Sequence, residues 1–474
     1  MKLAYPVNYK PKGAKEWGKV FLSALQQLLA ILAATIAVPA IINGNSAANF
    51  AEGIGVAANM STSAALFGAG VGTIVYLLFT RFKSPVFLGS SFAFLGAMAA
   101  AFTGAYTMSV GYLGLIIGAV LAGLVYVVLA IIVKFAGTAW VSKIMPPVVI
   151  GPTVAIIGLS LAGNAIGDLN GTKIGLVCGL VTLFVTIIAS VYGKKFIKTI
   201  PFIIGIVAGY LVATIFTLAG AEKLVNFAAF ENMQWVPDFS FVQAFFKNGL
   251  DFGPDGFGAY FATIAIAYIP VAFVVFAEHI ADHKNLSSII EHDLLTDPGL
   301  SNTLLGDGVG SMAGAFFGGC PNTTYGESVG CVAISGNASV ITILVTACLA
   351  IVSSFFAPFV TLLSTIPSCV MGGVCVALYG FIAVSGLKMI QKVNLEENKN
   401  LFVVSVILIA GVGGMALNFG KITITEVACA LILGILVNLV VGGMTKKSVK
   451  QAEAYAAKIT EAKEAAEKAE EQAE

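Results

Sequence analysis

Two acidic side chains stand inside or beside apolar runs, where a charge is usually retained for chemistry. Glu327 lies in the polar, glycine-rich stretch 320–330, and Glu278 lies near the end of another apolar run. A charged side chain in the hydrocarbon region costs roughly 2.5–3.5 kcal/mol or more by insertion scales. Such residues mark the path of a solute or an ion, and two carboxylates suggest a small polar solute held between acidic groups.

A third acid lies close to Glu278. Asp282 follows it by four residues, which places both side chains on one face of a helix. Two carboxylates on one face in a low-dielectric region do not readily stay ionised together, which suits a group that exchanges protons. The alternative is that the helix ends near residue 280 and leaves both acids at the interface. The polar stretch that continues to Asp293 favours this alternative.

The segment around Glu327 predicts a break in a membrane helix. Non-helical backbone at that depth persists only within protein or beside a water-filled cavity. Its backbone N–H groups could donate to a ligand carbonyl, while Glu327 accepts from a ligand N–H. Tyr325 and Phe92 could supply a flat aromatic wall. A capping or gating role for Glu327 is the alternative, and Asp307, between two glycines, suits either helix packing or a proton path.

Two histidines raise the possibility of a metal site. His279 and His283 frame Asp282 in an H-x-x-D-H pattern that is close to a zinc-binding helix motif. A catalytic zinc needs three protein ligands, the acid is Asp rather than Glu, and the third histidine of the chain is His292. We therefore expect no metal and no cofactor. One or both histidines should bond locally or tune Glu278 and Asp282.

The elements that position these residues are membrane helices. The 474 residues are 58% apolar and 11% charged, against about 25% charged in soluble domains. The net charge of +1 gives no indication of nucleic-acid binding. Each span needs about 20 apolar residues. The apolar runs predict an all-α polytopic membrane protein with fourteen segments, at about 20–42, 62–80, 86–101, 107–133, 147–163, 173–192, 199–219, 260–286, 298–318, 321–336, 338–357, 366–388, 400–416 and 422–443.

Basic residues set the expected orientation. With fourteen segments and the N-terminus inside, all but four of the 26 Lys and Arg fall on the inner side. The positive-inside rule predicts that skew. Residues 1–19 form a basic inner tail rather than a cleavable signal, and 446–474 form an Ala/Glu/Lys-rich inner tail. We expect the 220–257 loop to form a solvated cap on the outer side.

The two halves of the chain resemble each other. Residues 145–151 and 366–372 open the fifth and twelfth segments with similar Pro/Gly patterns, and 89–93 in the third segment matches 322–326 in the tenth. Segments seven apart run in opposite directions, so the halves predict inverted repeats. Transporters with inverted repeats bind substrate near the midplane, on broken helices in corresponding positions. The third and tenth segments are short and broken, and they occupy corresponding positions in the two halves.

Several of these segments resemble the nucleobase–cation symporter family, also called nucleobase–ascorbate transporters, and within it the bacterial uracil permeases. The similarity extends from Trp17 to about Lys446. It is most specific in the segments 88–94, 277–280, 297–300, 321–327 and 370–373.

The resemblance implies a fold of two inverted sevens with short strands in segments three and ten. A core domain would comprise 20–135 (segments 1–4) and 258–357 (segments 8–11). A gate domain would comprise 136–257 (segments 5–7) and 358–445 (segments 12–14). It also implies a homodimer in the bacterial cell membrane with both termini in the cytoplasm.

The resemblance further implies site roles. Glu278 and Glu327 would bond a pyrimidine, Tyr325 and Gly326 would lie near it, and Phe92 would pack on its ring. Glu278, His279, Asp282 and Asp307 would be the candidates for proton coupling.

Two departures from the family concern positions where other members have a histidine that can titrate. Some uracil permeases have His where this chain has Asp282, and His283 lies about 100° further round the helix. The family often has Gln-His in the first segment, where this chain has Gln26-Gln27, side chains that we expect mainly to bond neighbouring helices.

The expected activity is therefore proton-coupled import of uracil rather than enzymatic chemistry. Purine-specific members tend to have Gln-Asn at the position of Glu327-Ser328, which favours uracil over xanthine or urate. Uracil is neutral and offers two N–H donors and two carbonyl acceptors, which suit carboxylates and backbone amides. A purine permease, Na⁺ coupling, an anion carrier of the same architecture and a membrane zinc hydrolase are the alternatives.

Overall fold

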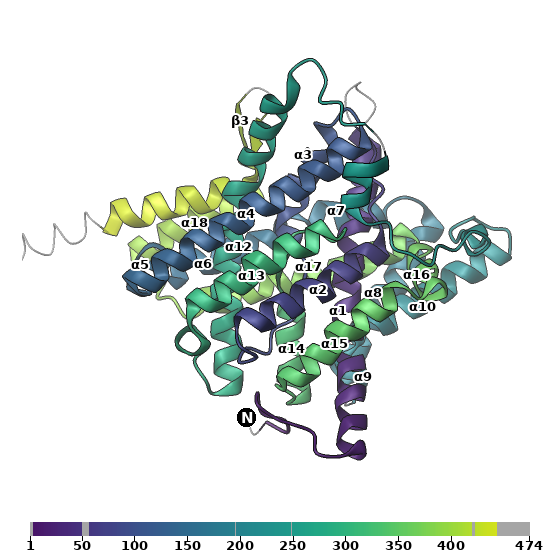
Figure 1. The fold of residues 1–474 in the computed structure, drawn as a ribbon, viewed down its shortest axis with the longest axis horizontal. Coiled ribbons are helices and arrows are strands. Elements are labelled where there is room, and N and C mark those ends of the chain that lie inside the picture. The colour runs from purple at the N-terminus through teal and green to yellow at the C-terminus, as the bar shows by residue number, and fades with distance from the viewer. Residues whose placement is uncertain (1–2, 50–55, 195, 248, 420–421, 443–474) are drawn as a thin grey trace, which may run out of the picture.

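The computed structural model describes residues 3–49, 56–194, 196–247, 249–419 and 422–442, and the 446–474 tail lies outside them. Within this part, the fold is helical with four short strands (Figure 1). The first half of the chain contains α1 (Ala14–Asn49), α2 (Thr62–Phe79), β1 (Leu88–Ser90), η2 (Phe92–Phe94), α3 (Leu95–Thr103), α4 (Met108–Ala136), α5 (Ala139–Ile144), α6 (Pro147–Ser160), α7 (Ala162–Leu169), α8 (Lys173–Tyr192), α9 (Phe196–Thr199) and α10 (Pro201–Leu218).

The second half follows a long connection that contains η3 (Phe227–Phe230), α11 (Ser240–Val242) and η4 (Gln243–Lys247). It contains α12 (Gly256–Ile290), η5 (Leu295–Gly299), α13 (Leu300–Phe316), β2 (Asn322–Thr324), α14 (Gly326–Ser335), α15 (Val340–Ser354), α16 (Ala357–Ser364), α17 (Ser368–Ile390), α18 (Asn398–Val412), β3 (Leu417–Phe419), β4 (Ile422–Ile424) and a last helix, Glu426–Gly442.

Eight helices of the described part are long and apolar enough to cross a membrane. The count rises to nine if α15 and α16, which meet at a bend of 84°, form one broken span. Every apolar run that was predicted as a segment contains a helix, but several of these helices are shorter than a full span. Length and apolarity therefore establish a multi-span helical membrane protein.

The third and tenth predicted segments each pair a short strand with a helix, as expected. β1 and β2 pair antiparallel, with Leu88 opposite Thr324, Gly89 opposite Thr323 and Ser90 opposite Asn322. Two further backbone bonds extend this ribbon, from the Ser91 N–H to the Pro321 carbonyl at 3.0 Å and from the Tyr325 N–H to the Phe87 carbonyl at 3.2 Å. The pairing satisfies backbone groups that a helix would otherwise satisfy, which non-helical backbone at membrane depth requires.

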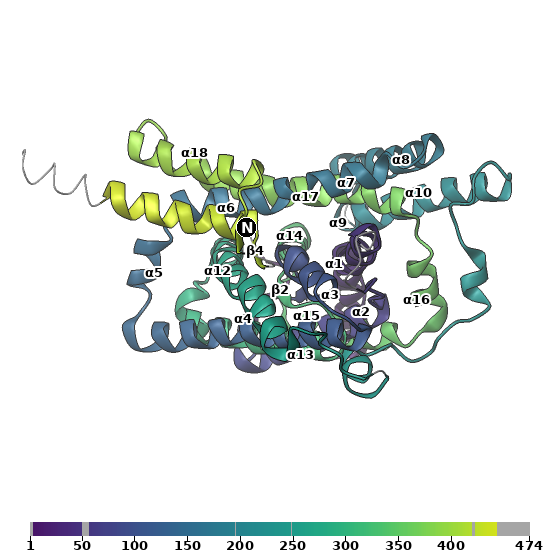
Figure 2. The same cartoon turned by 90° about the horizontal axis from the view of Figure 1, so that it is seen from above.

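The helices form two layers, which Figure 2 shows edge-on. One layer contains α2, α4, α13 and α15, and the other contains α6, α7, α8, α10, α17 and α18. Between the two layers lie α1, α12, α3, α14 and the β1–β2 ribbon.

The packing pairs repeat along the chain. The contact between α1 and α15 has a counterpart in the contact between α12 and α4. Likewise, the contact between α2 and α15 has a counterpart in the contact between α13 and α4. In the other layer, α6 packs on α18 as α17 packs on α8. Each second pair lies seven predicted segments from the first. The contacts α2–α13 and α6–α17 join segments that are themselves seven apart.

Glycine makes the α2–α13 contact possible. A Cβ on Gly68 would approach the Gly314 carbonyl oxygen at 2.5 Å, and a Cβ on Gly72 would approach the Gly310 carbonyl oxygen at 2.7 Å. These distances are too short for a side chain, so the two backbones approach through small residues, as membrane helices commonly do. The side chain of Asn322 fits against Gly72 and Gly314 and donates to the Gly68 carbonyl at 3.0 Å, which fastens β2 to α2.

Candidate functional site

α12 continues as one helix well beyond the first acidic residue. It ends at Ile290, and His279, Asp282 and His283 are all buried in it. The alternative that this helix stops near residue 280 and leaves the acids at an interface is therefore wrong. The helix continues through these polar residues because side chains on neighbouring elements form hydrogen bonds with them inside the protein.

Asp282 is tied to the strand ribbon. The Thr324 hydroxyl, at the end of β2, donates to Oδ2 of Asp282 at 2.7 Å, and both residues are buried. Oδ1 of Asp282 lies 3.8 Å from the position that a Cβ on Gly326 would take. Apart from the adjacent residues and the backbone of its own helix, no other atom lies within 4 Å of that position, and Gly326 is exposed although Tyr325 beside it is buried. The backbone of Gly326 therefore borders open space beside Asp282.

Of the four predicted acids, Glu327 and Glu278 have no fixed partner among the described residues. Both are partly exposed, and neither side chain makes a hydrogen bond to another residue in the described part of the chain. Glu327 lies in the first turn of α14, which begins at Gly326 immediately after the ribbon. Glu278 is within electrostatic range of Asp282, Glu327 and Asp307. The fold therefore gathers the four predicted acids in one region and leaves two of them free to bind.

The two helices that follow the ribbon start beside it. η2 and α3 follow β1 after Ser91, and α14 follows β2 after Tyr325. The first N–H groups of a helix have no partner inside the helix and carry the positive end of its dipole. Both helix starts therefore direct backbone donors to the region around the ribbon, next to the free carboxylates.

The two predicted aromatic residues differ in position. Phe92 is 7% exposed and meets the ring of Tyr379, on α17, edge to face with ring centroids 5.5 Å apart. Tyr325 is buried, and its ring lies against Gly89. The Tyr325 hydroxyl donates to the Ser90 carbonyl at 3.0 Å and accepts from Thr35 at 3.4 Å. Phe92 thus links η2 to α17, whereas Tyr325 fastens β2 to β1.

The histidines are engaged by protein partners. Nδ1 of His279 bonds Oδ2 of Asp307 at 2.7 Å, and its Nε2 bonds the Thr303 hydroxyl at 3.0 Å. Nε2 of His283 bonds the Tyr76 hydroxyl at 2.7 Å, and its Nδ1 lies 2.8 Å from the His279 carbonyl. All four ring nitrogens are occupied, and the described residues contain no group of three or more side chains that could hold a metal ion. The geometry does not fit a zinc centre.

Gln27 behaves as predicted. Its Nε2 donates to the Ser328 hydroxyl at 2.6 Å and so links α1 to α14 beside Glu327. Sequence reasoning missed Thr324, Tyr76, Thr303 and Ser328 as partners of the polar residues. The apolar runs that contain them carry many hydroxyls, and nothing local indicates which hydroxyl meets which acid or histidine.

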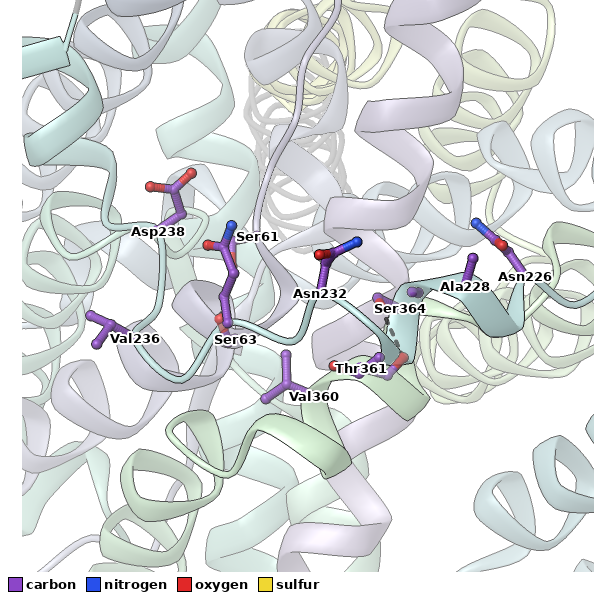
Figure 3. Close-up of a pocket in the computed structure, with 12 residues that line it drawn as sticks. Ser61, Ser63, Asn226, Ala228, Asn232, Val236, Asp238, Val360, Thr361 and Ser364 are labelled. Carbon is purple, nitrogen blue, oxygen red and sulfur yellow. Dashed lines mark hydrogen bonds between the residues drawn. The ribbon is translucent and has the colours of Figure 1, made fainter.

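Two open pockets lie at another place, by the C-terminal end of α1. The larger, of about 480 Å³, lies between the start of α2, the 226–238 loop and α16 (Figure 3). The second, of about 440 Å³, shares residues with it and extends between α1 and the start of α17. The four acids line neither pocket.

Comparisons with known proteins agree with the membrane fold. A family model described as "Permease family", for xanthine/uracil permeases, matches residues 18–419. The uracil permease of Bacillus caldolyticus is 38% identical over 435 residues, which cover 90% of this chain and 93% of that protein. The uracil permease of Bacillus subtilis is 36% identical, covering 88% and 91%, and that of Escherichia coli K12 is 33% identical, covering 88% and 90%.

Solved structures with the same fold are more distant in sequence. The transmembrane domain of the cyanobacterial bicarbonate transporter BicA superposes with a TM-score of 0.61 at 15% identity, covering 92% of this chain and 99% of that one. SLC26A9 superposes with a TM-score of 0.64 at 11% identity, covering 92% and 66%. At these identities the likeness concerns the fold alone.

Proposed function

This chain belongs to the xanthine/uracil permease family and is thus a transporter rather than an enzyme, and on that premise we propose that it imports uracil across the cell membrane. Uracil enters together with protons, by alternating access. The names of the similar permeases support the substrate class. The observation that carries the proposal is the pair of free carboxylates, Glu278 and Glu327, beside two helix starts.

The site matches the hydrogen-bonding groups of the base. Uracil has N–H donors for carboxylates and carbonyl acceptors for backbone amides. Glu278 and Glu327 accept from the N–H groups, and the backbone at Gly326 donates to a carbonyl. Phe92 packs on the flat ring, while Tyr325 holds the ribbon in place through Ser90. The open space beside Gly326 and the lack of fixed partners for both glutamates support these roles.

Proton coupling uses the acids of α12 and α13. Glu278, Asp282, His279 and Asp307 form one electrostatically connected group, in which Asp282 is bonded to β2 and Asp307 to His279. Protonation of one acid changes the stability of the charges around it. A proton taken up at Glu278 or Asp282 is thereby linked to the occupancy of the base site. Na⁺ coupling at the same carboxylates is the alternative.

The architecture completes the proposal. Fourteen segments form two inverted sevens, and the packing pairs that recur seven segments apart support this arrangement. The core domain comprises 20–135 and 258–357, and the gate domain comprises 136–257 and 358–445. Movement of one layer against the other exposes the site to each side in turn. The protein forms a homodimer in the cytoplasmic membrane with both termini inside.

The test is uptake of radiolabelled uracil into proteoliposomes under an imposed inward pH gradient, with unlabelled uracil or xanthine as competitor. We expect accumulation that requires the gradient and is competed by uracil only. Competition by xanthine would reassign the substrate to the purines. If accumulation requires a Na⁺ gradient instead, the coupling ion is Na⁺ rather than H⁺. If neither base is taken up, the proposed function is contradicted.

A further inference from the structure

The larger pocket, between the start of α2, the 226–238 loop and α16, is lined mainly by polar uncharged side chains. Asn226, Asn232 and Gln234 come from the 226–238 loop, opposite hydroxyls at the start of α2 and the end of α16. Figure 3 shows Asn226 and Asn232 along the loop, with Thr361 and Ser364 from α16 beside it. None of the three carboxamides makes a side-chain hydrogen bond to another residue in the described part of the chain. A carboxamide offers both donors and an acceptor, so the pocket presents unused groups of both kinds.

The charge of the pocket disfavours an anionic ligand. Its one carboxylate, Asp238, is bonded to Lys247 at 2.9 Å, and no Lys or Arg of the described residues lines the cavity. A phosphate or another anion would have no unpaired cation to bind. A planar neutral amide fits better, because Asn and Gln side chains pair with the donor and acceptor groups on the edge of a base through two hydrogen bonds.

The pocket borders a second cavity that lies along α1. The second cavity shares Gln234, Asp238 and Ser364 with it and extends inward along α1 to Ile36. Ile36 follows Thr35, whose hydroxyl bonds the Tyr325 hydroxyl at the β1–β2 ribbon. The second cavity thus reaches a residue of α1 that is adjacent to one contacting the β1–β2 ribbon.

We propose that the larger pocket is a staging site, at which a neutral pyrimidine base binds through Asn232 and Gln234 before it reaches Glu278 and Glu327. This inference rests on the proposed uracil transport and on the proposed outer location of this end of α1. The two connections that border the pocket, the 226–238 loop and α16, each join the two layers of helices. A base bound there lies where the layers separate when the path opens.

The kinetic test replaces both carboxamides by a side chain of similar size without hydrogen-bonding groups. The double variant Asn232→Leu/Gln234→Leu should raise KM for uracil about tenfold, the equivalent of two weak hydrogen bonds, with less than a twofold change in the maximal rate. Asn170→Leu is the matched control, because Asn170 is an exposed carboxamide that does not line the pocket. A KM equal to that of the control would count against the staging site.

A labelling experiment detects the site directly. Ser364→Cys places a thiol in the pocket, and Cys348→Ser removes the exposed one of the seven native cysteines. An impermeant maleimide should label this protein, and millimolar uracil should slow the labelling. The protection should persist when Glu327→Gln is added and disappear when Asn232→Leu/Gln234→Leu is added. The staging site would be overturned if uracil never slows the labelling. It would also be overturned if uracil slows the labelling equally in the protein with Asn232→Leu/Gln234→Leu.

The two proposals fail in different ways. If the unaltered protein accumulates uracil but Ser364→Cys is never protected, the staging site is wrong and the transport function stands. If the unaltered protein neither accumulates nor binds uracil, the proposed function itself is contradicted.

Discussion

The replacement Glu327→Gln tests the base site with little disturbance of the fold. The Glu327 side chain is partly exposed and bonds no other described residue, so the exchange breaks no existing hydrogen bond. Gln has nearly the same size and shape. The unfolding temperature in detergent should therefore stay close to that of the unaltered protein, because substitutions that disturb no packing or bonding usually change stability by about 0.5 kcal/mol or less.

The expected loss of binding follows from the chemistry of the bond. A hydrogen bond between a ligand N–H and a carboxylate contributes about 1.5–3 kcal/mol. Since each 1.4 kcal/mol corresponds to a factor of ten, uracil should bind roughly 10- to 150-fold more weakly. Accumulation at low uracil concentration should then fall to background. Glu278→Gln should also weaken uracil binding. The loss of binding free energy in the double variant is not expected to equal the sum of the two single losses, because both groups contact one ligand.

Equilibrium binding of radiolabelled uracil to purified protein measures this effect separately from transport. Glu396→Gln is the matched control, since Glu396 is an exposed glutamate in the connection between α17 and α18. Normal binding by Glu327→Gln would refute the assignment of the carboxylate to the base. An equal loss in Glu396→Gln would show that the assay reports net charge rather than a site.

Two further predictions concern the framework of the site. Gly89→Ala places a Cβ against the ring of Tyr325, so we expect a loss of about 1–3 kcal/mol of stability and weaker uracil binding, with Gly171→Ala, which meets no atom within 4 Å, as the silent control in thermal unfolding. The bond from Lys83, at 2.7 Å, holds the pKa of Asp297 below its ordinary value of about 4, so its small contribution is present above pH 4 and is lost as the pH falls. Lys83→Met should therefore lower the unfolding temperature slightly at pH 7 and match the unaltered protein near pH 3.

The helical segments were predictable because lipid imposes a strong local pattern. Apolar runs of about span length identify α4 or α8 without any knowledge of their neighbours. The broken segments were also predictable, since Gly, Ser and Thr interrupt the apolar runs around 89–93 and 320–330. The run at 338–357 was predicted as one segment and contains α15, but the short helix α16, which follows at an angle of 84°, was not predicted. The apolar character continues across that bend, so composition alone does not reveal it.

The site was only partly predictable, because its contacts join distant parts of the chain. The acids were found from their unusual positions in apolar surroundings. The bond from Thr324 to Asp282 depends on the β1–β2 register and on the rotation of α12. The segment predicted at about 260–286 agrees with α12 to within a few residues, but an earlier end near residue 280 stayed open as an alternative for the same reason. His283 and Asp282 look like interfacial residues until Tyr76 and Thr324 are brought against them.

The two halves of the chain differ where the proposed solute binds. In the alignment of 89–93 with 322–326, Phe94 corresponds to Glu327. Phe94 is buried and stacks on Tyr268 of α12, with ring centroids 5.5 Å apart, so the first half uses this position for packing. The second half uses the corresponding position for a free carboxylate. A similar framework thus presents an apolar side from η2 and an acidic side from α14, and this asymmetry suits a flat base whose N–H groups lie along one edge.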